Sequence, residues 1–360
     1  MRLTDYPAAQ GFSPRIPLIV VGALRSGGSG KTSMTLELAR ELAARGLRPA
    51  ILAYRLGSGP GLASGQGSGS AASDRREDPS EVRTDSDWRA SSEEAVLLRR
   101  ESGVRVFVTR NRAAAWRRLH EARFQEGGAF DILLSDDGFQ DPRLRGALRL
   151  LLSAPGERPG LFDLLPGGPF RETRRAAARA DLRLEGPYPE AFPAPAHPSD
   201  PSGPADGPAP EGKPAGYPQY VTSGIPGAAS PSGIPVFPFR RRLIPPPGFD
   251  HGRPWIVFCA LGDNGPFLAD LARLGIRPVA VITGRNHAAP PLKKLRAAAA
   301  LHPDAGILCT RKDFLKLEAQ GADLPLHPMG QALVLDPEIP DAVMAWRLLS
   351  GNRYLVHYPG

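Results

Sequence analysis

A glycine-rich turn near the start of the chain ends in a lysine and a threonine, and this combination suits the chemistry of phosphate groups. The turn follows the apolar run 18–22 and reads Gly27-Gly28-Ser29-Gly30-Lys31-Thr32. Backbone N–H groups in such a turn converge on a phosphate. The Lys31 ammonium would then reach the β- and γ-phosphates, and the Thr32 hydroxyl would bind Mg²⁺. The turn predicts that residues 27–32 bind a nucleoside triphosphate.

Two adjacent carboxylates, Asp136 and Asp137, follow the apolar stretch 130–134. Proteins with a phosphate-binding loop place an acidic residue at the C-terminal end of a parallel strand, where it serves Mg²⁺. Open α/β sheets bind their ligands at this same edge. We expect one carboxylate to hold Mg²⁺ together with Thr32, directly or through water, and the other to orient its neighbours. The sequence leaves open which of the two does which.

The elements expected around these groups alternate between strand and helix. Strands are predicted over 17–22, 49–54, 104–108, 130–134 and 149–152, and helices over 31–45, 91–101 and 111–124. Strand–helix–strand crossovers give parallel strands. We therefore expect a P-loop-type α/β domain with a parallel sheet over residues 1–185.

A stretch rich in Pro, Gly, Ser and Ala covers residues 186–235 and predicts a linker or a disordered insertion. A second, smaller α/β domain is expected over 236–360. Its strands are predicted near 254–260, 278–282, 306–309 and 332–335, alternating with helices near 266–274, 290–301 and 311–319. This alternation predicts a second parallel sheet.

Composition indicates an anionic partner and a reducing compartment. The net charge is +8 and the pI is about 9.8, which suits a nucleotide, a nucleic acid, a phospholipid surface or a phosphorylated substrate. The two cysteines, Cys259 and Cys309, are expected to be buried thiols. We identify no signal peptide and no run of about 18 apolar residues, so a cytoplasmic location is expected.

Four motifs in a fixed order resemble one family, the tetraacyldisaccharide 4′-kinases, which are the lipid A 4′-kinases of Gram-negative bacteria. Members carry turns similar to GNLTxGGTGKTP, DDG[LF]QH, LPAGPLRE and TxKD. The matching runs here are GALRSGGSGKTS at 22–33, DDGFQD at 136–141, LPGGPFRE at 165–172 and TRKD at 310–313. The resemblance covers most of residues 17–335, apart from 186–235.

The resemblance implies an activity, a fold and a membrane-bound acceptor. The activity is transfer of the ATP γ-phosphate, with Mg²⁺, to the 4′-hydroxyl of a tetraacyldisaccharide 1-phosphate. The implied active site lies in the cleft between two α/β domains. Because the acceptor carries acyl chains, we expect peripheral contact with the anionic inner face of the cytoplasmic membrane, made through arginine clusters. No nucleic-acid partner is expected, and no oligomeric state is predicted.

The resemblance also assigns catalytic positions. The family's general-base Asp lies in a GDEP segment, and the matching run 92–95 places Glu93 there. Glu94 stays open as an alternative, because the register of the match could differ by one residue. A structural role for Glu93 is also open, because acidic residues in a first helical turn are favoured by the helix dipole alone. His287 matches a family histidine that supports the base. Arg171 is expected to steady a phosphate, since its planar guanidinium suits bidentate contacts.

Several positions depart from the family pattern. The family asparagine after the first loop glycine is Ala23, the last histidine of the acidic motif is Asp141, and the base is a glutamate. Members also usually begin with an apolar membrane helix, which we do not find here. A related kinase with a changed acceptor is therefore an alternative. Others are a nucleotide-switch ATPase, whose signature lysine is replaced by Ser26, and a GTP-dependent metallochaperone.

Overall fold

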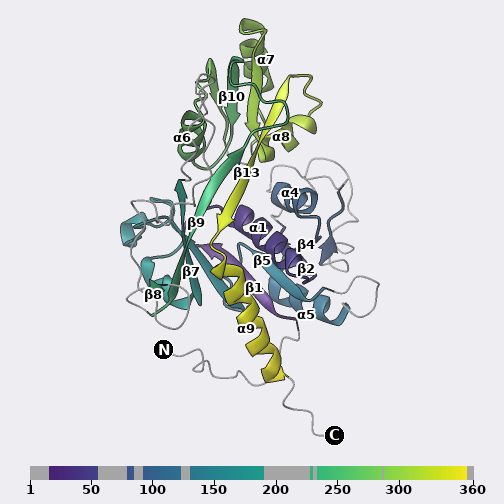
Figure 1. Cartoon of the computed structure of the whole chain (residues 1–360), viewed down its shortest axis with the longest axis vertical. Helices are drawn as coiled ribbons and strands as arrows, with labels where there is room; N and C mark the ends of the chain where they lie inside the picture. Colours follow the sequence, from purple (N-terminus) through teal and green to yellow (C-terminus); the bar gives the residue numbers. More distant parts are fainter. Residues whose placement is uncertain are drawn as a thin grey trace, which may run out of the picture.

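The computed structural model describes residues 16–55, 79–84, 92–122, 130–189, 228–229, 233–285 and 288–354. Its strands form one sheet that runs through two lobes (Figure 1). Along the sheet the order is β11-β10-β12-β13-β9-β7-β6-β1-β5-β2-β4-β3. The short strand β8 (Ala228–Ala229) pairs with β9. The predicted α/β class is confirmed.

The lower lobe contains the strands expected from the N-terminal part of the sequence. They are β1 (Leu18–Ala23), β2 (Pro49–Tyr54), β3 (Ser80–Glu81), β4 (Arg105–Thr109), β5 (Ile132–Asp136), β6 (Leu148–Ser153) and β7 (Leu182–Pro189). From β7 to β4 these strands pair in parallel, and only β3 is antiparallel to its neighbour. The central strands are buried on both faces, which explains their unbroken apolar sequences.

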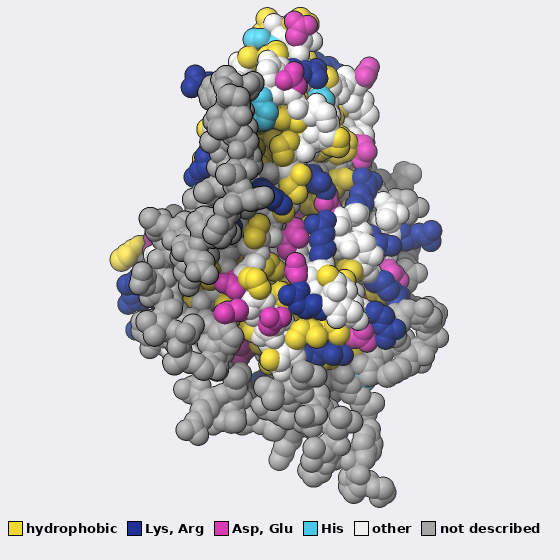
Figure 2. Space-filling model, in the orientation of Figure 1, with side chains coloured by type: hydrophobic (Ala, Val, Ile, Leu, Met, Phe, Trp, Pro, Cys, Tyr) yellow, Lys and Arg dark blue, Asp and Glu magenta, His cyan; other side chains and the backbone are white. Residues whose placement is uncertain are grey.

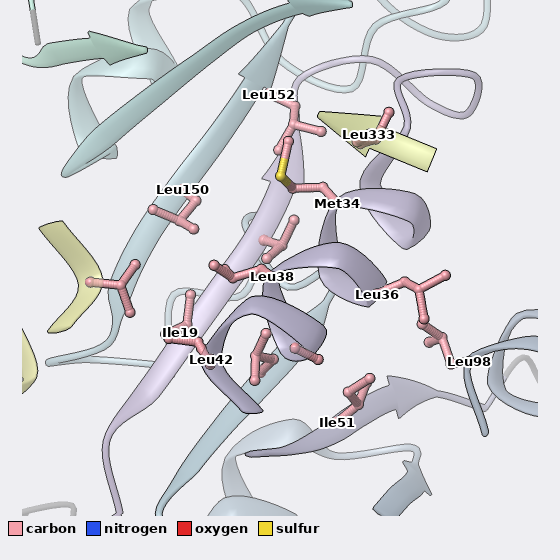
Figure 3. Close-up of a cluster of buried hydrophobic side chains, with 14 of the residues drawn as sticks. Ile19, Met34, Leu36, Leu38, Leu42, Ile51, Leu98, Leu150, Leu152 and Leu333 are labelled. Carbon is pink, nitrogen blue, oxygen red and sulfur yellow. The ribbon is translucent and has the colours of Figure 1, made fainter. Parts of the chain in front are cut away.

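Helices cover both faces of this sheet. The helices α1 (Lys31–Ala44) and α4 (Glu93–Ser102) pack on one face, and α5 (Arg112–Ala122) packs on the other. Figure 3 shows Met34, Leu38 and Leu42 of α1 directed at the apolar side chains of β1 and β6, while Leu36 meets Leu98 of α4. These contacts fix the start of α1 over the edge at which β1 ends.

The upper lobe contains the second run of alternating elements. Its strands are β10 (Trp255–Cys259), β11 (Ala280–Thr283) and β12 (Gly306–Thr310), and its helices are α6 (Gly265–Arg273), α7 (Leu292–Leu301) and α8 (Arg311–Glu318). The three strands pair in parallel, as expected. Both cysteines are buried free thiols here, as predicted.

Two long strands join the lobes, and this join differs from the sequence-based expectation. The strands β9 (Pro235–Ile244) and β13 (Leu326–Leu335) pair antiparallel, although a wholly parallel second sheet was expected. The helix α9 (Glu338–Tyr354), which was not predicted, returns across the lower lobe (Figure 1). Leu333, Ile339 and Val343 enter the lower-lobe core. Residues 236–360 thus contribute to the cores of both lobes.

Most of the predicted insertion 186–235 lies outside the described residues, although β7 extends into it as far as Pro189. Among the described residues, the structure contains no helix that is both long enough and apolar enough to cross a membrane.

Candidate active site

The turn between β1 and α1 has the backbone of a phosphate-binding loop. Gly27, Gly28 and Gly30 have φ angles of 88°, 69° and 78°, a region that glycine enters without steric cost. Gly30 is the N-cap of α1, so the free N–H groups of the first helical turn point into the loop. Gly22 lets the acidic turn approach, because a Cβ there would lie 2.3 Å from the Cβ of Phe139.

The side chain of Lys31 folds back into this loop. Its Nζ lies 3.0 Å from Ser29 Oγ, 3.4 Å from the carbonyl oxygen of Arg25 and 3.7 Å from Asp137 Oδ1. Burial lowers the pKa of Lys31, and the neighbouring carboxylates partly oppose that shift. The ammonium therefore lies where it would meet a phosphate held by the loop.

Asp136 ends β5 and is buried beneath the loop. Its two carboxylate oxygens each accept a 3.1 Å hydrogen bond, one from Thr32 Oγ1 and one from Thr35 Oγ1. Burial, reinforced by the charge of Asp137, raises the pKa of Asp136 to about 6. The hydroxyl of Thr32 and the two carboxylates supply the hard oxygen ligands that Mg²⁺ requires, so these residues fit a Mg²⁺ ion.

Asp137 lies in a more cationic environment than Asp136. Arg171 donates two parallel hydrogen bonds to it, at 2.8 and 2.9 Å. Burial alone would raise the pKa of Asp137, but the bonds from Arg171 and the charges of Lys31, Arg171 and Arg112 hold it below its usual range. The two adjacent carboxylates thus differ in their protonation chemistry.

Arg171 is fixed by its own backbone. Its N–H donates to the carbonyl of Leu24 at 2.7 Å, and its guanidinium also donates to Gln140 Oε1 at 3.3 Å. Gln140 Nε2 in turn donates to the carbonyl of Ala23 at 2.9 Å. We call residues 27–32, Asp136, Asp137 and Arg171 the phosphate end of the site.

The predicted base lies at the same edge of the sheet but in a different contact network. Near the ends of α1 and α4, Arg40 donates to the carbonyl of Glu101 at 2.7 Å, so the two helices run side by side in the same direction. Glu93 begins α4, just as Lys31 begins α1. The topology therefore places Glu93 at the edge that carries the phosphate end.

Glu93 is held by the upper lobe. It is 4% exposed, and its carboxylate lies 2.8 Å from Lys316 Nζ and 3.7 Å from Lys312 Nζ. Lys312 also pairs with Glu94 at 2.7 Å. We call Glu93, Glu94, Lys312 and Lys316 the base end. His287 lies outside the described residues.

Two of these features were missed by sequence reasoning. Arg112 at the start of α5 donates to the carbonyl of Asp136 at 2.9 Å and lies over the ring of Tyr54. The sequence signal for Arg112 was its position after the predicted strand 104–108, because residues that follow parallel strands lie at the ligand-binding edge of the sheet. Lys316 follows Lys312 by one helical turn, a spacing that places both on one face of α8. Nothing in the sequence pointed from that face to Glu93.

A cavity of about 390 Å³ opens beside the phosphate loop, between the lobes. Its walls include Gly28 and Ser29 of the loop, Pro155 after β6, Tyr188 of β7, and Arg241, Asp270 and Arg273 from the upper part of the molecule. Arg241 Nε donates to Asp270 Oδ2 at 2.6 Å, and Arg25 pairs with Asp263 at 3.9 Å. The cavity lies on the β6–β7 side of β1, opposite the acidic turn.

Known proteins resemble most of the chain. A family model described as "Tetraacyldisaccharide-1-P 4′-kinase" matches residues 1–346. The tetraacyldisaccharide 4′-kinase of Acidovorax sp. (strain JS42) is 30% identical over 337 residues, covering 91% of this chain and 78% of that protein. The enzyme of the same name from Halorhodospira halophila is 36% identical over 167 residues, or 46% of this chain and 45% of that protein.

A solved structure shares the fold. The crystal structure of LpxK from Aquifex aeolicus in complex with ATP aligns with a TM-score of 0.56 and 22% identity, covering 92% of this chain and 89% of that one.

Proposed function

This chain belongs to the tetraacyldisaccharide 4′-kinase family, and from that membership we propose that it transfers the γ-phosphate of ATP to the 4′-hydroxyl of a tetraacyldisaccharide 1-phosphate. It is a kinase whose acceptor is an alcohol group, and it acts in lipid A biosynthesis.

The phosphate end binds the triphosphate. The N–H groups of residues 27–32 surround the β-phosphate, and Lys31 reaches the transferred group. Thr32 and Asp136 hold Mg²⁺, which when bound neutralises charge on the β- and γ-phosphates. Asp137 positions Arg171 through their two hydrogen bonds, and Arg171 then faces a phosphate of ATP or of the acceptor.

The nucleoside of ATP occupies the cavity beside the loop. The γ-phosphate must lie toward Asp136 and Asp137, on the β5 side of β1, so the nucleoside extends to the other side, where β6 and β7 end. The cavity volume of about 390 Å³ falls in the range of roughly 300–1,000 Å³ that is usual for small-molecule sites. The backbone near Pro155 and the side chains of Tyr188 and Asp270 line the cavity in which the base and the ribose would lie.

The base end accepts the proton of the attacking hydroxyl. Glu93 is the proposed base, because it begins α4 at the edge where the γ-phosphate is held. The buried ammonium of Lys316 at 2.8 Å favours the ionised form that a base needs. His287 remains a proposed helper.

The convergence of Lys31 and Arg171 on Asp137, at 3.7 and 2.8 Å, is the observation that most favours phosphoryl transfer over a simple nucleotide switch. The test is an assay with γ-labelled ATP and the tetraacyldisaccharide 1-phosphate, followed by analysis of the labelled lipid. Label on the 4′-position supports the proposal. Hydrolysis of ATP without labelled lipid would favour a switch ATPase, and label on another alcohol would indicate a changed acceptor.

A further inference from the structure

Large apolar side chains lie in solvent on the segment between β6 and β7. Phe162 is 99% exposed, Leu161 76% and Leu165 53%. Single exposed apolar residues are common on protein surfaces. Here, however, three lie within five positions of one loop, beginning with the short 3₁₀ helix η1 (Leu161–Asp163). Such a group indicates a surface that is covered in use.

Hydrogen bonds hold these side chains outward. Gly160 N donates to Asp163 Oδ2 at 2.8 Å, Phe170 N donates to the Asp163 carbonyl at 3.0 Å, and Leu165 N donates to the Phe170 carbonyl at 2.8 Å. The turn is tight, because a Cβ at Gly168 would lie 2.2 Å from the Asp163 carbonyl oxygen. The backbone of the loop is therefore set by its own hydrogen bonds. It does not depend on burial of the three exposed apolar side chains, Leu161, Phe162 and Leu165, which we call the apolar tip.

The base of the same loop is anchored on the phosphate end. Ser26 N donates to the carbonyl of Pro169 at 2.8 Å, and Arg171 N donates to the carbonyl of Leu24 at 2.7 Å. Arg171 then reaches Asp137. Whatever the apolar tip contacts is consequently held beside the site of phosphoryl transfer.

Basic side chains flank the tip. Arg158, Arg174 and Arg175 are exposed, and within the described ranges none of them forms an ion pair with a carboxylate. The N–H of Arg174 donates to the carbonyl of Pro159 at 3.0 Å, which brings the two flanks together. In Figure 2, a hydrophobic group projects from the left edge of the lower lobe with Lys and Arg side chains beneath it.

We propose that residues 158–175, the interfacial loop, dock the enzyme on an anionic phospholipid bilayer by inserting Leu161 and Phe162 among the headgroups. Apolar side chains that enter the boundary of headgroups and acyl chains, combined with basic side chains that attract anionic lipids, are the usual elements of peripheral binding. The inference rests on the proposed function for its lipid acceptor, which would then reach Arg171 from the plane of the leaflet.

The first test measures vesicle binding. The full chain is sedimented with vesicles of phosphatidylcholine alone and of phosphatidylcholine mixed with phosphatidylglycerol. The variant Leu161→Ser/Phe162→Ser should lose about tenfold or more in partition, since each side chain leaves an apolar environment. Both positions are exposed, so the variant should fold. The matched control is Leu301→Ser, which changes a side chain that is 78% exposed at the end of α7 and should bind as wild type.

A charge variant tests the basic flank. Arg174→Glu/Arg175→Glu should weaken binding to the anionic vesicles and reduce the loss of binding on adding salt, because the attraction that salt screens within about 10 Å at 0.1 M is then smaller. Lys293→Glu/Lys294→Glu on α7 is the matched control and should behave as wild type. Unchanged binding of both loop variants would overturn the proposal. So would a wild-type dimer that the Leu161→Ser/Phe162→Ser variant dissociates, because a second copy would then cover the tip.

The second test separates docking from chemistry. Transfer to the acceptor is measured in mixed vesicles and in detergent micelles. In the variant Leu161→Ser/Phe162→Ser, the rate of transfer should fall about tenfold with vesicles and change little with micelles. An equal loss of transfer rate in vesicles and in micelles would assign Leu161 and Phe162 to catalysis and overturn the proposal. If wild type transfers nothing in either system while vesicle binding still depends on Leu161 and Phe162, the proposed function fails and the docking surface stands.

Discussion

The phosphate end and the base end of this site are built in different ways. The phosphate end is made within the lower lobe, where Lys31, Asp136, Asp137 and Arg171 contact one another directly. The base end joins the lobes, because Glu93 on α4 is held by Lys316 on α8. The contacts to the phosphates can thus be preformed in one lobe, whereas the base is supported only when the lobes are docked.

Further ion pairs cross between the same two helices. Arg100 of α4 lies 2.9 Å from Glu318 of α8, and Arg311 of α8 pairs with Glu101 of α4. These outer pairs are partly exposed, and exposed pairs contribute little each. The Glu93–Lys316 pair is buried, so removing one partner would leave an uncompensated charge. The docking of the lobes is therefore most sensitive to this inner pair.

The largest effect is expected at the phosphate end. Lys31→Ala should reduce transfer by roughly 10²–10⁴-fold, because it removes one preorganised charge from the transferred phosphate. The measurement is the rate of acceptor phosphorylation at saturating ATP. Activity close to wild type would contradict the assignment of the loop.

The next effect is expected at the base end. Glu93→Gln should lower kcat by roughly 10²-fold or more, because it removes both the proton acceptor and the charge that faces Lys316. The affinity for ATP should stay nearly unchanged, because the phosphate contacts lie within the lower lobe. Glu94→Gln is the control, as it removes only the partner of Lys312. An inactive Glu94→Gln beside an active Glu93→Gln would move the base by one residue.

A stability measurement can sharpen the difference between the two ends. The pKa of Asp136 is about 6 in the folded state against an ordinary 3.8, so the folded protein binds this proton more tightly than the unfolded chain. The free energy of unfolding, measured without Mg²⁺, should therefore fall as pH rises from about 4 to about 6. Above that window, Asp136→Asn should stabilise the protein by about 3 kcal/mol while lowering activity. Denaturant unfolding at pH 5 and pH 7.5 checks this, and a less stable variant at pH 7.5 would contradict it.

The phosphate end could be predicted from the sequence because its information is local. A buried parallel strand is an unbroken apolar run, and glycines with positive φ mark the turn that follows β1. The same reasoning located the acidic pair, and the family resemblance located Arg171, although their roles as magnesium ligands and phosphate contact stay predictions. The contact between Arg171 and Asp137 could not be predicted from spacing alone.

The joining elements were predicted only in part, at 332–335 of β13, because their patterns are mixed. In β9, Phe237, Phe239 and Leu243 are buried, but prolines and three arginines interrupt the run. The partners at the base end are distant in sequence, since Lys312 and Glu94 lie 218 positions apart. Pairing at that distance is set by how the lobes dock, and neither residue carries a local signal for it.

The claim that the base end depends on the upper lobe is tested most directly by the pH profile of Lys316→Met. A buried carboxylate that loses its neighbouring cation is protonated more readily. The acidic limb of the plot of kcat against pH should therefore move to higher pH, and kcat should fall about tenfold at the low-pH end of that plot. The affinity for ATP should not change, and Lys316→Arg should restore the profile. An unmoved limb would show that the base does not depend on Lys316, and a parallel loss of ATP affinity would show that the two ends are not built separately. Either result would contradict the account.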